Sequence, residues 1–127
     1  IMKELQDLQE NIITLLDNAY NLTRQALKQV QSRDFEKLVE VLDHRERAIN
    51  VINSLSEKLH LYGKNPNTPI SLIAFNNQVS QVIEAINNMD DIITTCLEHE
   101  KEKTQFEIAK TFKNKENFKG YNLNSLK

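Results

Sequence analysis

The stretch LIAFNNQVSQVIEAINNMDDIITTC, residues 72–96, decides how the rest of the chain must fold. Its apolar residues recur at alternating steps of three and four, the spacing of a long helix packed lengthwise on other helices. They are Leu72, Phe75, Val79, Val82, Ile86, Met89, Ile93 and Cys96. The faces between them carry polar residues, among them Asn76 and Asp90, which are expected to be solvated. One helix cannot bury such a stripe alone, so other helices must supply its partners.

Two further helices are predicted upstream, over about residues 2–31 and 34–62. The first carries two adjacent apolar rows, whose combined arc of roughly 160° indicates contact with two neighbours. The second begins at Asp34, a good N-cap, and its main apolar row is interrupted by Arg45. We expect the stem of Arg45 to pack in the bundle while its guanidinium reaches out to a carboxylate. The alternative is that Arg45 orders a binding surface.

The predicted fold is all-α, an antiparallel up-down-up bundle of three helices that forms a single domain over residues 1–127. The stretch Gly63–Pro69 is the expected loop, and the third helix is predicted over about 69–100. A short fourth helical segment is expected at about 104–113, followed by a flexible tail at 114–127. A segment of this kind can dock on the body and leave it.

Composition limits the partners that the chain is expected to have. Charged residues make up 27% of the 127 residues, with a net charge of −2. Residues 1–100 hold nine Lys/Arg against fifteen Asp/Glu, whereas residues 101–127 hold seven Lys against three Glu. The basic end lacks arginine and is diluted by glutamate, so no nucleic-acid partner is expected. No membrane insertion is expected, and a single cysteine, Cys96, favours a reducing cytoplasm.

The sequence offers no constellation of residues suited to catalysis, so the protein is predicted not to be an enzyme and to need no cofactor. Glu57 and His60 have the spacing of one Glu-x-x-His metal motif, but carboxylate-bridged sites need two such motifs. His44 lies in a context that partly fits a histidine phosphotransfer domain, yet the glycine expected downstream is missing. Cys96 lies on the apolar row, where an inert thiol is expected. We therefore expect no catalytic, metal or cofactor-binding residues.

Two stretches resemble bacterial flagellar export chaperones of the FliT and FlgN type. The first is SRDFEKLVEVLDHRERAI, residues 32–49, and the second runs from MDDI, residues 89–92, to FKGYN, residues 118–122. The resemblance covers nearly the whole chain and is closest to the FliT type. It implies a cytoplasmic protein that binds the amphipathic C-terminal helix of a late flagellar subunit and delivers it for export. The implied clients are the filament cap protein or the hook–filament junction proteins, and the implied further partners are the export ATPase and the export gate.

The resemblance also implies roles for C-terminal residues. In FliT-type proteins a C-terminal helix folds over the body and restrains binding. Phe106, Ala109 and Phe112 would belong to that restraining segment here, and Tyr121 matches a tyrosine implicated in contact with the export gate.

Helices with two apolar rows leave grooves, and grooves accept an amphipathic helix through residues spaced three and four apart. Candidate client-binding residues are Val41, Ala48, Ile92 and Leu97, with Tyr20 and Leu27 as second choices. For each of them, an ordinary place in the core is the competing interpretation. The competing function is that of a generic coiled-coil adaptor or homodimerising bundle with no flagellar client.

Overall fold

Three long helices make up almost all of the residues that the computed structural model describes, which are 2–63, 71–99 and 108. They are α1 (Met2–Gln31), α2 (Phe35–Gly63) and α3 (Ser71–Glu98). No strand occurs in the described ranges, so the predicted all-helical class is confirmed. The predicted segment 104–113 and tail 114–127 lie outside the described residues, apart from Ile108.

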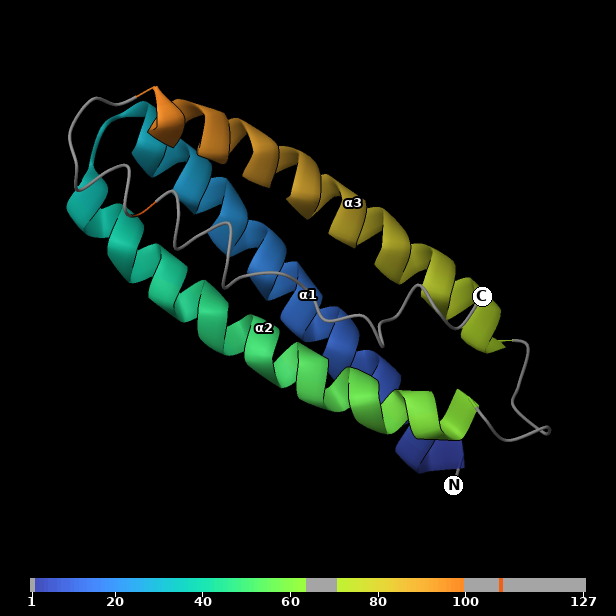
Figure 1. Cartoon of the computed structure of the whole chain (residues 1–127). Coiled ribbons are helices and arrows are strands. Elements are labelled where there is room, and N and C mark those ends of the chain that lie inside the picture. The colour runs from blue at the N-terminus through green and yellow to red at the C-terminus, as the bar shows by residue number, and fades with distance from the viewer. Residues whose placement is uncertain (1, 64–70, 100–107, 109–127) are drawn as a thin grey trace.

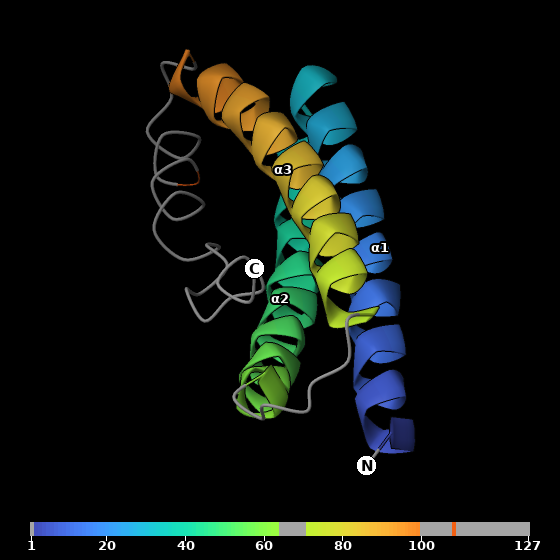
Figure 2. The same ribbon diagram turned by 90° about the vertical axis from the view of Figure 1, so that its right-hand side faces the viewer.

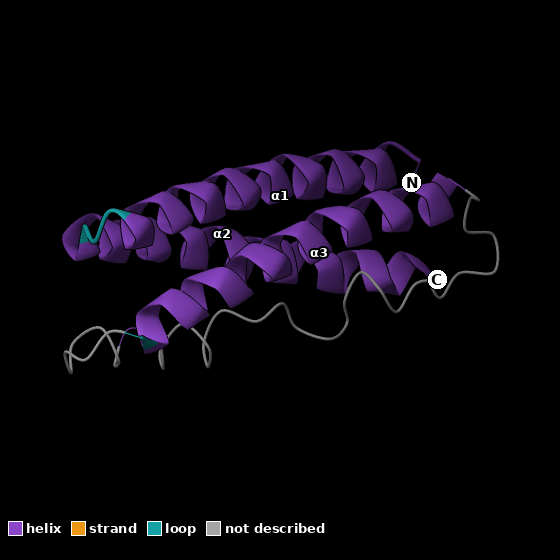
Figure 3. Ribbon diagram, turned by 90° about the horizontal axis from the view of Figure 1, so that it is seen from above, coloured by secondary structure: helices purple, strands orange, loops and turns teal. Residues whose placement is uncertain are grey.

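The helices pack together as an elongated bundle (Figure 1). The chain ascends in α1, descends in α2 and ascends again in α3, so α2 is antiparallel to both α1 and α3. At roughly 1.5 Å per residue, each helix is about 45 Å long. The carboxyl-terminal end of α3 leans away from α1, as Figures 2 and 3 show from two directions. Helix α1 contacts both other helices and therefore organises the bundle.

A tight turn joins α1 to α2 because backbone groups at both helix ends find partners. The N–H of Asp34 donates to the Gln29 carbonyl at 2.9 Å. Arg33 has a φ of 61°, the left-handed conformation that commonly ends a helix. The Asp34 carboxylate then accepts a hydrogen bond from the Lys37 N–H at 3.2 Å. Asp34 is thus the N-cap that the sequence predicts, and α2 begins at the next residue.

The apolar core falls into two clusters along the bundle. The buried members of cluster one come from α1 as far as Ala19, from the second half of α2 and from α3 as far as Ile86: Leu5, Ile12, Leu16, Ala19, Ile52, Leu59, Phe75, Val79, Ile83 and Ile86. The buried members of cluster two come from the opposite end of each helix: Ala26, Val30, Leu38, Leu42, Ile93 and Leu97. Because each cluster draws on all three helices, neither can form without the whole bundle.

The buried face of α3 differs from the predicted one. Val82, Met89 and Cys96 were expected in the core and are only half-buried. The inner row instead follows Asn76, Val79, Ile83, Ile86, Asp90, Ile93 and Leu97, again at steps of three and four. Asn76 and Asp90, which were expected on a solvated face, therefore belong to the inner row. The physical reason is that Asp90 pairs with the buried guanidinium of Arg45 on α2, so the row that carries Asp90 faces inward.

Candidate functional site

A buried arginine marks the middle of the bundle. The Arg45 side chain, on α2, has 0% exposure. Its Nη1 lies 2.5 Å from Asp90 Oδ1 and its Nη2 lies 2.6 Å from Asp90 Oδ2 on α3. Two parallel hydrogen bonds between a guanidinium and a carboxylate are the strongest geometry available to an ion pair. The prediction that Arg45 meets a carboxylate is confirmed, but the prediction that its head reaches outward is wrong.

Helix α1 supplies the third member of this polar group. Arg45 Nη1 also donates to Thr23 Oγ1 at 3.1 Å, and that hydroxyl donates to the Ala19 carbonyl at 2.7 Å. Thr23 is fully buried, so its hydroxyl is satisfied from within the protein. Arg45, Asp90 and Thr23, which we call the polar triad, therefore connect all three helices.

The electrostatics of Asp90 reflect competing influences. Burial raises the pKa of the Asp90 carboxyl above its ordinary value of 3.8, and nearby Asp91 acts in the same direction. The hydrogen bonds and the positive charge of Arg45 lower the pKa and offset part of that rise. Asp90 is therefore a carboxylate that needs its cation to remain charged in this position.

The polar triad lies between the two apolar clusters. On α1, Thr23 falls between Ala19 of cluster one and Ala26 of cluster two; on α3, Asp90 falls between Ile86 and Ile93. Buried polar groups of this kind fix helix register in some bundles, because a slipped register leaves them without partners. The triad thus suits a structural role, and none of its three members lines either of the two pockets described below.

A second buried polar residue lies near the start of α3. Asn76 has 0% exposure, and within the described residues neither its Oδ1 nor its Nδ2 has a hydrogen-bond partner. An amide in such a place is costly, by about 1–3 kcal/mol for each unsatisfied group. Asn76 is two heptads before Asp90, so both polar residues occupy equivalent positions on the helix.

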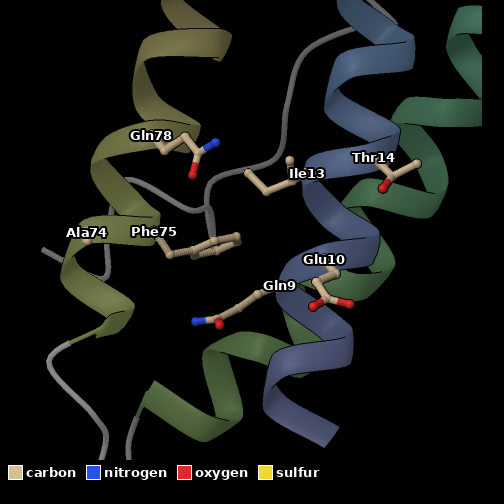
Figure 4. Close-up of a pocket in the computed structure, with 7 residues that line it drawn as sticks. All are labelled: Gln9, Glu10, Ile13, Thr14, Ala74, Phe75 and Gln78. Carbon is tan, nitrogen blue, oxygen red and sulfur yellow. The ribbon is translucent and has the colours of Figure 1, made fainter. Parts of the chain in front are cut away.

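One pocket opens between α1 and α3 beside Phe75, with a volume of about 600 Å³ (Figure 4). The Phe75 ring extends from α3 toward α1, and the side chains of Gln9 and Ile13 extend toward α3. The lining residues are Gln9, Glu10, Ile13, Thr14, Ala74, Phe75 and Gln78. Its polar rim is made of neutral amides and hydroxyls together with a single carboxylate.

Another pocket, of about 370 Å³, opens between α1 and α2. Its apolar walls come from both helices, and its rim carries imidazole, guanidinium and amide groups rather than carboxylates. The lining residues are Leu15, Asn18, Leu22, His44, Arg47, Ala48 and Val51. We call this pocket the α1–α2 groove.

The structure does not bring the six candidate client-binding residues together into one groove. Leu97 is fully buried in cluster two, and Val41 and Leu27 pack at the edge of that cluster. Tyr20 packs against cluster one, and Ala48 lines the α1–α2 groove. Ile92 is 48% exposed on α3. Apolar periodicity identified packed positions but could not separate the inner row from its flanks.

Of the residues assigned to the C-terminal segment, Phe106, Ala109, Phe112 and Tyr121 lie outside the described residues. Ile108, which belongs to the same segment, is described. It is helical, half-buried and packed against cluster two. A side chain from beyond α3 therefore contacts the same end of the bundle as Val41 and Leu27.

The described residues contain no group of three His, Cys, Asp or Glu side chains placed to hold a metal ion. None of the described helices has both the length and the apolar character needed to cross a membrane. Comparisons with protein families, curated proteins and solved structures yield no match to this chain.

The sequence analysis predicted a carboxylate partner for Arg45 but did not identify it as Asp90. The available signal was the spacing of Ile83, Ile86, Ile93 and Leu97, which leaves Asp90 as the missing member of an inner row. A polar residue at such a position, together with an arginine at a core position of another helix, is the pattern of a buried ion pair.

Proposed function

We propose that the protein is a cytoplasmic chaperone that holds the amphipathic C-terminal helix of a late flagellar subunit and delivers it to the flagellar export apparatus. The client is the filament cap protein or a hook–filament junction protein, and the onward partners are the export ATPase and the export gate. The proposal joins the resemblance of residues 32–49 and 89–122 to FliT-type chaperones with the helical bundle described above.

The observation that carries the proposal is the contact of Ile108 with cluster two. A helical residue from outside the three long helices is half-buried there, among partly buried residues that include Leu27, Val41 and Cys96. An amphipathic client helix presents apolar side chains in the same way. This end of the bundle is thus chemically suited to accept either the C-terminal segment of the chain or a client helix in its place.

Competition between the two occupants leads to a binding experiment. The full chain and a chain ending at Lys103 are each titrated with the C-terminal helix of a flagellar cap protein or junction protein. The shorter chain should bind the client helix more tightly, because no internal segment competes for the site. Equal or weaker binding by the shorter chain would reject the restraint.

A point variant separates competition from other effects of truncation. Ile108→Glu weakens the apolar contact with cluster two without shortening the chain, and it should also increase client affinity. The matched control is Ile73→Glu, which places the same charge at an exposed position of α3. Failure of every form to bind any flagellar subunit, in titrations and in pull-downs from a flagellated bacterium, would reject the chaperone proposal itself.

A further inference from the structure

We infer that the α1–α2 groove is a second docking surface, and that its partner is an amphipathic helix with acidic residues beside its apolar stripe. The groove shares no residue with cluster two or with the residues packed against it. The inference therefore does not depend on the flagellar client proposed above.

The walls of the groove provide apolar surface that α1 and α2 do not cover. Leu15 is half-buried, and Val51 remains 47% exposed. Between them Ala48, with its short side chain, leaves a hollow of about 370 Å³. A row of this kind between two antiparallel helices accepts the apolar side chains of a third helix, spaced three and four apart.

Charge on the groove rim selects the partner. Arg47 and His44 line the groove. Two exposed lysines continue the same face of α2: Lys37 lies seven residues before His44, and Lys58 lies seven residues after Val51. The only carboxylate at the equivalent positions of this strip is Glu40, seven residues before Arg47. On α1, the corresponding positions 11, 18 and 25 are Asn, Asn and Gln.

This basic strip contrasts with its surroundings. Residues 1–100 contain fifteen Asp/Glu against nine Lys/Arg, so a helix rich in carboxylates is repelled by most of the body. Along the groove and the strip of α2 that continues it, the same helix meets three cations and a histidine against one carboxylate, Glu40. Such complementarity chooses the partner and its orientation, while the apolar contact supplies most of the affinity. The pocket between α1 and α3 would not favour an acidic helix in this way, because its one charged lining residue is Glu10.

The inference is tested on the full chain with two fluorescent helical peptides that share one apolar stripe. One peptide carries glutamates beside the stripe, and the other carries lysines at the same positions. The glutamate peptide should bind on the order of tenfold more tightly, and higher salt should reduce the difference. Backbone amide NMR shifts caused by that peptide should map to the residues lining the α1–α2 groove.

Matched charge reversals locate the effect. Arg47→Glu should weaken binding of the glutamate peptide by on the order of tenfold, and Val51→Glu should do the same. Arg24→Glu changes the net charge equally, but Arg24 lies nine residues from Leu15 and so on the far side of α1, about 180° away. It should leave the affinity nearly unchanged. Circular dichroism confirms that each variant remains helical.

Three results would overturn the inference. The first is equal binding of the two peptides, and the second is a set of shifted amides around Phe75 instead of Ala48. The third is binding of phosphatidylglycerol vesicles that Arg47→Glu abolishes, without binding of the glutamate peptide, which would make the strip a lipid surface.

Discussion

Arg45 and Asp90 are 45 positions apart in the chain, yet the guanidinium of one and the carboxylate of the other form two hydrogen bonds of 2.5 and 2.6 Å in the middle of the bundle. The pair joins α2 to α3, and Thr23 extends it to α1. The pair is largely removed from water. Removing one of the two charges should therefore affect stability differently from replacing both residues with apolar ones.

Removing only the cation should destabilise the protein strongly. Arg45→Met leaves the Asp90 carboxylate in its buried position without a counter-charge, at a cost of about 3 kcal/mol. The double variant Arg45→Met, Asp90→Leu removes both charges. Its free energy of unfolding should lie within about 1 kcal/mol of that of the parent protein. Urea denaturation followed by circular dichroism measures both. A double variant no more stable than Arg45→Met would contradict this account.

The loss of unfolding free energy caused by Arg45→Met, relative to the parent protein, should depend on pH. In the unfolded chain Asp90 titrates near 3.8, and in the variant two influences that lower its folded-state pKa are lost, so the pKa rises further. The native state then binds more protons than the unfolded state above pH 3.8, and the unfolding free energy falls as pH rises across that window. Unfolding curves between about pH 4 and 8 should show a deficit that grows and then levels off. For the double variant, which lacks the carboxyl, the difference from the parent should vary far less.

The stability of alanine variants distinguishes two candidate binding residues on α3, one buried and one exposed. Leu97→Ala should cost about 3 kcal/mol, because Leu97 is fully buried in cluster two. Ile92→Ala should change stability by less than about 0.5 kcal/mol, because Ile92 is 48% exposed. Thermal and urea unfolding of the two variants check this. Equal costs would mean that the inner row of α3 has been misidentified.

The backbone conformation of Arg33, in the turn between α1 and α2, can be tested by comparing two substitutions. Arg33 holds a φ of 61°, which residues with a Cβ adopt at a cost of about 1 kcal/mol and glycine adopts freely. Both Arg33→Gly and Arg33→Ala remove the stacking of the guanidinium over Phe35 at 5.8 Å. Arg33→Gly should therefore be more stable than Arg33→Ala by about 1 kcal/mol. The difference in melting temperature between the two variants is the measurement, and a more stable alanine variant would contradict the role of this backbone conformation.

Local sequence patterns were sufficient to predict the three helices and the turn between the first two. Apolar residues at steps of three and four extend through each one, and the Arg33–Asp34 turn stops the first and starts the second. These are local properties, because helix periodicity and capping depend on residues only a few positions apart. The predicted ranges 2–31 and 34–62 accordingly differ from the observed ones by at most one residue. Within the described residues α3 spans Ser71–Glu98, which lies inside the predicted range of 69–100.

The rotation of α3 about its own axis, by contrast, depends on contacts between helices. Two rows of α3, one through Met89 and one through Asp90, have equally good spacing and share Val79, Ile86 and Ile93, which are buried as predicted. Where the rows differ, the core contains Ile83 and Leu97 rather than Val82 and Cys96. The outcome depends on what faces each row: Arg45 makes a carboxylate at position 90 favourable in the interior, and that pairing spans 45 residues of sequence. A charge becomes acceptable in a core only when its partner is present in three dimensions, and periodicity along one helix contains no information about that partner.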